Sequence, residues 1–258
     1  MKKTKAARWR RGYRRCTQEG GLLVAFTLAG LTAACSHEPA DKELRTLATS
    51  SEAESRRARE EQKMHALIAR LTAVEGLEHL LTRSIDSCHG PQDGSIFENN
   101  RSPYALTCSM RADAYFGVRG EITDMLPRIR AAGIATWGPQ DGEGRDMPYA
   151  AGTVTYALNY HRARGKFQDS TLMPAPTLEA PELRLDWDRP NLPLPNRIEE
   201  PAPCPETGSA MIYWRCSIAP EDPMTVAAAR TRYDTVLTLS LGRWDSSAYN
   251  YFTVPRRK

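Results

Sequence analysis

Apolar residues recur at steps of three and four along residues 64–85, while the positions between them are mostly polar or charged. This spacing is typical of an amphipathic helix, whose apolar stripe packs on the rest of a domain. The heptad pattern breaks near Gly76, so the sequence does not predict a long coiled coil. The expected stripe consists of Met64, Leu67, Ile68, Leu71, Val74, Leu77, Leu81 and Ile85.

The following segments alternate between strand and helix patterns. Residues 104–118 predict a strand, and residues 122–132 predict a short helix that Gly133 ends. Pro127 fits this helix only near its first turn. Residues 150–161 alternate apolar and polar side chains, which predicts a second strand. A strand, a helix and a strand in succession favour an α+β domain.

Proline sets the pattern of the next part of the chain. Residues 173–205 hold nine of the 18 prolines, a density that central strands do not accept. We therefore expect an extended connector that crosses the domain and includes one short edge strand at residues 183–187. The final part is too short for a core of its own, so its strands should pack with the first half. These expected strands are residues 209–218, 233–241 and 249–254.

The expected fold is therefore α+β, with an amphipathic N-terminal helix packed on a mostly antiparallel sheet and a Pro-rich connector. It occupies residues 64–258. Residues 35–63 precede it and are polar and charged, with Arg and Glu at the i,i+4 spacing of helical ion pairs. Because few of these residues are apolar, we expect a charged, solvated tether here.

Charge is distributed unevenly along the chain. The whole chain has a net charge of +4, yet residues 1–34 carry eight Lys and Arg and a single Glu. The remainder therefore has a net charge of −3. A nucleic-acid-binding domain needs a basic surface, so this distribution argues against a nucleic-acid partner.

The N-terminal segment has the pattern of an export signal. After the basic stretch, residues 20–36 contain no charge, and the run is too short and too rich in small residues to be a typical membrane span. Thr32, Ala33 and Ala34 directly precede Cys35. This resembles the lipobox of bacterial lipoproteins, although Thr32 stands where that motif prefers Leu.

The lipobox resemblance implies lipidation of Cys35, removal of residues 1–34 and anchoring to the extracytoplasmic face of the cell membrane. A signal peptide cut elsewhere and an uncleaved single-pass anchor remain alternatives. The rest of the chain loosely resembles uncharacterised lipoproteins of high-GC Gram-positive bacteria, a likeness that implies no activity.

Four cysteines follow Cys35, and an even number in an exported chain favours disulfides. Of the three possible pairings, we favour the one that closes two short loops, Cys88 with Cys108 and Cys204 with Cys216. A zinc site is the alternative, but no C-x-x-C spacing supports it.

No motif in the sequence indicates catalysis. The signatures of serine hydrolases, zinc proteases and nucleotide sites are absent, His161 is a lone histidine, and Asp186 and Asp188 share one strand face. We therefore expect no cofactor or metal, and a non-catalytic role in binding or scaffolding with an envelope protein or glycan as partner. The alternative is an envelope enzyme, such as a hydrolase, with an unfamiliar site. Aromatic residues that could form a binding surface are Tyr213, Trp214, Trp244, Tyr249 and Tyr251.

Overall fold

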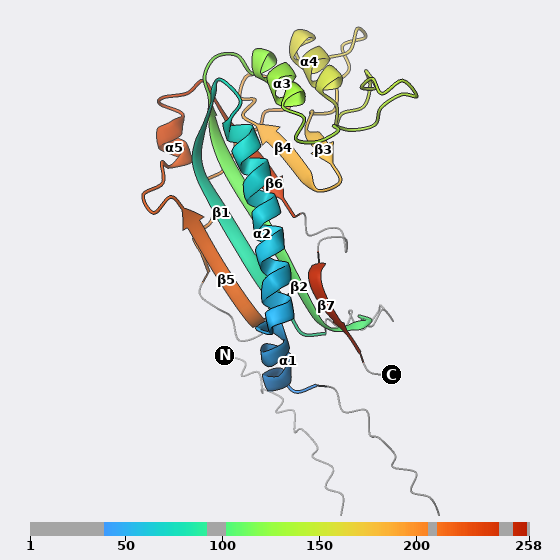
Figure 1. Ribbon diagram of the computed structural model, residues 1–258. Helices are drawn as coiled ribbons and strands as arrows, with labels where there is room; N and C mark the ends of the chain where they lie inside the picture. Colours follow the sequence, from blue (N-terminus) through green and yellow to red (C-terminus); the bar gives the residue numbers. More distant parts are fainter. Residues whose placement is uncertain (1–38, 92–101, 206–210, 243–249, 257–258) are drawn as a thin grey trace, which may run out of the picture. The chain divides into compact units, whose positions relative to one another are not determined.

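The structure is a computed structural model that describes residues 39–91, 102–205, 211–242 and 250–256 (Figure 1). Residues Ser36–Lys258 form one compact unit. Its helices are α1 (Asp41–Ala48), α2 (Ser51–Thr72), α3 (Ile122–Ala131), α4 (Val154–Arg162) and α5 (Val226–Ala229). Its strands are β1 (Leu77–His89), β2 (Tyr104–Val118), β3 (Leu178–Ala180), β4 (Leu183–Trp187), β5 (Met211–Ala219), β6 (Thr235–Leu241) and β7 (Asn250–Pro255).

The described strands form one sheet in the order β3-β4-β6-β2-β1-β5, and β7 pairs with β2 beyond the end of β6. Every one of these pairings is antiparallel, which confirms the expected α+β class with an antiparallel sheet. The strand predicted at residues 183–187 is β4, but it pairs with both β3 and β6. The edge on that side is therefore the three-residue strand β3 and not β4.

Helix α2 lies along one face of the sheet, in front of β1 and β2 in Figure 1. Ser50 caps it by accepting a hydrogen bond from the Ala53 amide, at 3.3 Å. Its buried stripe begins at Ala53 and Arg57 and continues through Met64, Ile68 and Leu71. The prediction of a solvated tether at residues 35–63 is wrong from Asp41 onward, because α1 and the first half of α2 pack on the sheet.

The expected helix also ends earlier than its pattern suggested. Gly76, at φ +90, follows α2, and the chain then enters β1. Leu77, Leu81 and Ile85 are spaced by four residues, which is also a multiple of the strand period of two. A bulge between His79 and Leu81 shifts the register, so that Leu77 belongs to the main core and Leu81 to the apolar cluster on the opposite face of the sheet. The helical spacing of these apolar residues is therefore met by a bulged strand with both faces covered.

The segment predicted as a strand at residues 150–161 is helix α4. Thr153 caps this helix by accepting a hydrogen bond from the Tyr156 amide, at 3.1 Å. Its buried residues include Ala157 and Tyr160, which a strand would place on opposite faces. The helix predicted at residues 122–132 is confirmed as α3, although Pro127 is its sixth residue and lies beyond the first turn.

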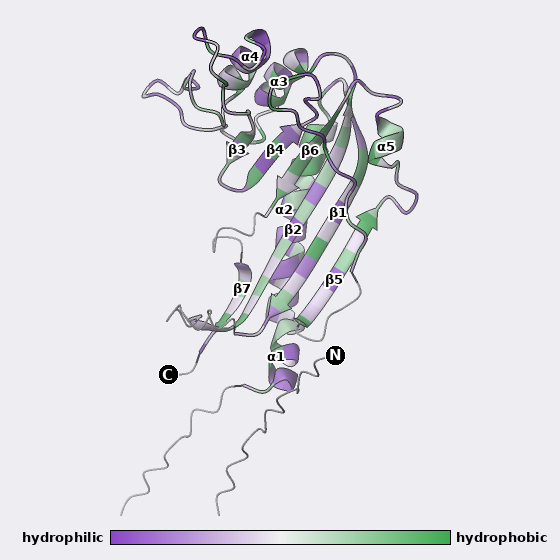
Figure 2. Ribbon diagram, turned by 180° about the vertical axis from the view of Figure 1, so that it is seen from behind, coloured by the Kyte–Doolittle hydropathy of each residue, from purple (hydrophilic) through white to green (hydrophobic). Residues whose placement is uncertain are grey.

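The Pro-rich connector crosses the face of the sheet opposite α2, as seen from behind in Figure 2. Ile198 from this connector packs with Leu80 and Leu81 of β1 and with Val226 of α5. This second apolar cluster is separate from the main core between the helices and the other face of the sheet. The sheet is thus covered on both faces, with different parts of the chain on each.

Candidate functional site

Two disulfides tie the domain together. Cys88 and Cys108 are directly opposite each other in the β1–β2 pair, and their sulfur atoms are 2.03 Å apart. Cys204 of the connector is bonded to Cys216 of β5, with a sulfur–sulfur distance of 2.07 Å. This is the predicted pairing, and it excludes these thiols as zinc ligands. Such disulfides indicate an oxidising, extracytoplasmic compartment.

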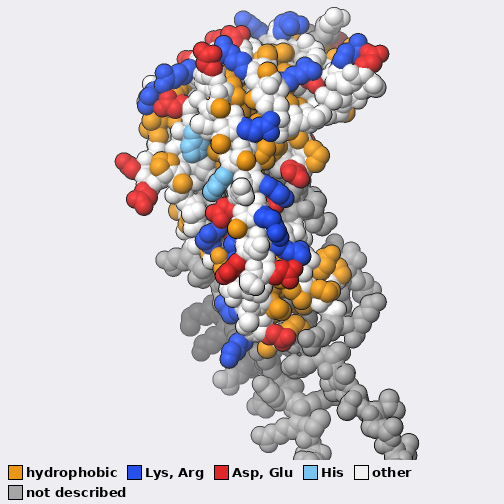
Figure 3. All heavy atoms as spheres, viewed as in Figure 1, with side chains coloured by type: hydrophobic (Ala, Val, Ile, Leu, Met, Phe, Trp, Pro, Cys, Tyr) orange, Lys and Arg blue, Asp and Glu red, His pale blue; other side chains and the backbone are white. Residues whose placement is uncertain are grey.

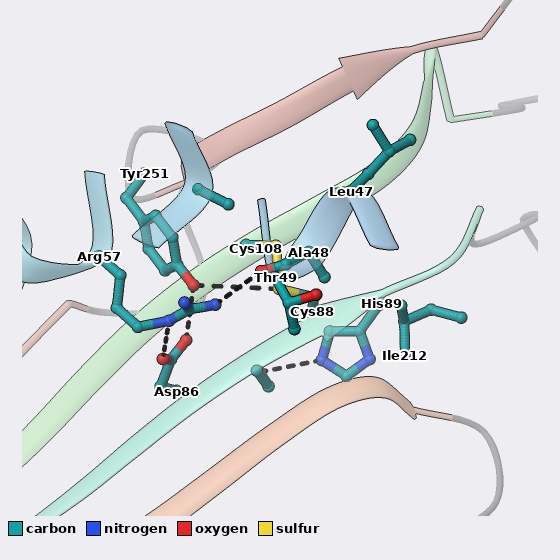
Figure 4. The surroundings of a disulfide bond; sticks show 12 residues. Leu47, Ala48, Thr49, Arg57, Asp86, Cys88, His89, Cys108, Ile212 and Tyr251 are labelled. Atoms are coloured by element: carbon teal, nitrogen blue, oxygen red, sulfur yellow. Dashed lines mark hydrogen bonds and ion pairs between the residues drawn. A yellow bond between two sulfur atoms is a disulfide. The ribbon is translucent and has the colours of Figure 1, made fainter. Parts of the chain in front are cut away.

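A buried ion pair connects α2 to the sheet beside the first disulfide (Figure 4). The Arg57 Nε donates to Asp86 Oδ2 at 2.6 Å, and its Nη2 donates to the Ala48 carbonyl at 3.0 Å. Tyr251 donates its hydroxyl proton to the other Asp86 oxygen at 2.7 Å. The guanidinium lies 4.2 Å from the ring centre of Tyr213. These residues form what we term the Arg57–Asp86 cluster.

The electrostatics of this cluster favour its present protonation states. Burial, with the Asp86 carboxylate second, raises the pKa of the Tyr251 hydroxyl. Burial lowers the pKa of Arg57, but Asp86 and the two tyrosines outweigh it and the net pKa is raised. The tyrosine therefore stays neutral and the arginine stays charged. Since each group already has a partner, the cluster offers no free nucleophile or base.

The space next to the cluster is too small for a substrate. A cavity of about 20 Å³ lies between α2 and the sheet and is lined by Glu61, Asp86 and Arg215, among others. That volume is enough for about one water molecule. Arg215 also donates to Glu61 at 3.1 Å, so the polar groups at the cavity are largely satisfied. The arrangement serves to hold α2 on the sheet.

The aromatic residues predicted to form a binding surface do not lie together. Tyr213 and Tyr251 contact Arg57 from the sheet face that α2 covers; Tyr251 is buried there and Tyr213 is partly buried against the core. Trp214 follows Tyr213 in β5 and is partly buried on the opposite face. Trp244 and Tyr249 lie outside the described residues. The three described members therefore do not form one continuous surface.

His161 takes part in a structural contact. Its Nε2 accepts a hydrogen bond from the Trp187 indole at 3.1 Å, and the two rings are stacked. Burial and the charge of Arg189 lower the pKa of His161 to about 4. A neutral imidazole whose nitrogen is occupied by an indole N–H is a poor catalytic base.

Asp186 and Asp188 are likewise engaged in structure and are not paired for catalysis. Arg189 donates to Asp186 at 2.6 Å. Asp188 accepts bonds from the Arg230 guanidinium at 2.8 and 2.9 Å and from the Ile198 amide at 2.7 Å. These bonds fasten the connector, at Arg189 and Ile198, and helix α5 to the end of β4.

An open hollow of about 290 Å³ lies beside α2, where Lys and Arg side chains gather in Figure 3. Arg56, Arg59 and Lys63 line it together with Glu60 and Glu182. Arg56 is paired with Glu52 and Lys63 with Glu60, both at the surface. Exposed pairs of this kind contribute little energy, and the mixed charges select no particular ligand.

Sequence reasoning missed Arg57 and Asp86, since each stands among charged or polar residues that no motif distinguishes. Within the described ranges, no group of three His, Cys, Asp or Glu side chains is placed to hold a metal ion. No helix in the same ranges is long and apolar enough to cross a membrane. Cys35, the expected lipidation site, lies outside the described residues. Comparison with protein-family models, with curated proteins and with solved structures finds no significant match.

Proposed function

We propose that this protein is a lipid-anchored protein of the bacterial cell envelope whose folded domain binds or scaffolds other envelope components. The anchor is a lipid on Cys35, and the domain lies on the extracytoplasmic side of the membrane. The observation that supports the non-catalytic role is that the buried titratable side chains already have structural hydrogen-bond partners. Asp86, Asp188 and His161 are all occupied by structural partners.

The short spacer supports a role close to the membrane. Five residues, Ser36–Ala40, separate Cys35 from the start of α1. A chain of this length can span at most about 20 Å. The folded domain therefore follows the proposed anchor almost directly, since the charged segment that would have formed a stalk is helical and packed. Two or three acyl chains at Cys35 give firm anchoring.

Fatty-acid labelling and intact-mass measurement of the protein from a bacterial membrane fraction test this proposal. We expect the wild-type protein to begin at Cys35 and to carry added acyl mass. The Cys35→Ala variant should lose the label, whereas Cys16→Ala, the matched control within the signal segment, should keep it. Retention of residues 1–34, or cleavage elsewhere without lipid, would refute the anchor and leave a single-pass or secreted protein.

A further inference from the structure

A short hairpin beyond α4 exposes apolar side chains. Residues 163–172 leave α4 and return toward the connector, in the α3–α4 layer labelled in Figure 1. Lys166 and Leu172 face each other as a bridge across the hairpin. Phe167 is 40% exposed and Leu172 is 51% exposed. Large apolar side chains exposed near each other are a common feature of protein-binding sites.

The hairpin is held in a defined shape. The Phe167 amide donates to the Thr171 carbonyl at 2.9 Å, and the Met173 amide donates to the Gly165 carbonyl at 3.0 Å. Met173 is buried against Tyr156 and Tyr160 of α4. A preorganised loop loses little conformational entropy when it binds, so Phe167 and Leu172 are suited to recognition.

Three exposed cations, Arg162, Arg164 and Lys166, accompany the apolar pair. Among the described residues, none of the three lies within ion-pair distance of a carboxylate. Asp169 is the one acid of the hairpin, and it accepts hydrogen bonds from the Thr171 hydroxyl and amide at 2.6 and 3.0 Å. The hairpin is therefore positively charged around its apolar residues.

We propose that this hairpin docks a second envelope protein, one that presents Asp and Glu carboxylates around an apolar pocket. Phe167 and Leu172 would enter the pocket, and Arg162, Arg164 and Lys166 would pair with the carboxylates at its rim. A bilayer is the less suitable partner because each apolar side chain is already about half covered, which leaves little area for insertion. The inference rests on the binding role proposed above and names the surface that performs it.

Photocrosslinking in intact bacteria tests the proposal with the full-length chain. A photoreactive benzoyl-phenylalanine replaces Phe167, and the same residue replaces Tyr104 in the matched control. Tyr104 is 37% exposed, close to the exposure of Phe167, but belongs to β2 and not to the hairpin. We expect a discrete protein adduct from position 167 that position 104 does not form, with a crosslinked peptide rich in Asp and Glu.

Charge variants then test the recognition itself. Lys166→Glu should lower the adduct yield roughly tenfold, as expected when a rim charge is reversed. Arg59→Glu, on the exposed face of α2, should leave the yield unchanged. Exchanging a partner carboxylate for Lys should restore the adduct of the Lys166→Glu variant, which a change in folding alone could not do.

Several outcomes would overturn the inference. These are an adduct with lipid, the absence of a position-specific adduct, and a protein adduct that Lys166→Glu leaves unchanged. Fatty-acid labelling of the same strains separates this result from the anchor. A labelled protein without the adduct rejects only the hairpin surface, whereas loss of the label rejects the proposed anchoring through Cys35.

Discussion

Arg57→Met should destabilise the domain strongly, because it removes one partner of a buried ion pair. Asp86 is 2% exposed and receives its shortest ion-pair contact, 2.6 Å, from the Arg57 guanidinium. In the variant, Tyr251 still donates to Asp86, and among the described residues the remaining ion-pair contact of Asp86 is with Arg215, at 4.0 Å. The carboxylate would then be buried without a close counter-charge.

The size of the expected destabilisation follows from the burial of both Arg57 and Asp86. Breaking a buried ion pair by removing one partner costs about 3 to 5 kcal/mol. For a domain of this size, each kcal/mol lowers the melting temperature by roughly 2 to 4 °C, so the expected loss is roughly 6 to 20 °C. The bond from Arg57 to the Ala48 carbonyl, which is lost as well, places the value toward the upper part of this range.

Thermal unfolding followed by circular dichroism, on the domain from Ser36 onward with its disulfides intact, measures this loss. Arg56→Met is the matched control. Arg56 is the adjacent residue of α2, but its pair with Glu52 is exposed and of the i,i+4 type, which contributes only about 0.5 kcal/mol. If Arg57→Met cost no more than Arg56→Met, the cluster would not be what holds α2 on the sheet, and the reasoning would fail.

Three further changes have defined outcomes. Burial lowers the pKa of His161 in the folded protein to about 4, so the unfolded chain binds a proton on this side chain more readily than the folded chain does. The free energy of unfolding should therefore fall as the pH drops from about 6.5 toward 4, by at most about 1.4 kcal/mol per pH unit. His161→Gln should flatten that slope in denaturant titrations, and an unchanged slope would contradict the assignment. Replacing Cys204 and Cys216 by Ser should cost about 3 kcal/mol, because the bond closes a loop of 12 residues; equal denaturation midpoints would contradict this. A Cβ at Gly117 would lie 2.4 Å from the Tyr233 ring, so Gly117→Ala should lower the free energy of unfolding by about 1 to 3 kcal/mol, as measured by thermal unfolding. Gly142→Ala is the control, because a Cβ at that position meets nothing within 4 Å.

Local patterns predicted several elements correctly because their determinants lie close together in the chain. The strand β2 and the helix α3 occur where their patterns placed them. The disulfide partners could be chosen because Cys88–Cys108 and Cys204–Cys216 each close a short loop. The density of prolines excluded a central strand across most of the connector. The lipobox resemblance at Cys35 is also a matter of adjacent residues, and it stays a prediction.

Contacts between distant parts of the chain decided the rest. The first half of α2 seemed solvated because its buried stripe contains Arg57, and only Asp86, 29 residues later, makes burial of that charge favourable. The spacing of Leu77, Leu81 and Ile85 suggested a helix, but pairing with β2 and β5 makes this segment a strand, and a bulge places Leu77 and Leu81 on opposite faces of the sheet. Residues 150–161 likewise alternate apolar and polar side chains as a strand does, but they form helix α4. A residue pattern encodes periodicity, whereas burial and pairing depend on partners that only folding brings together.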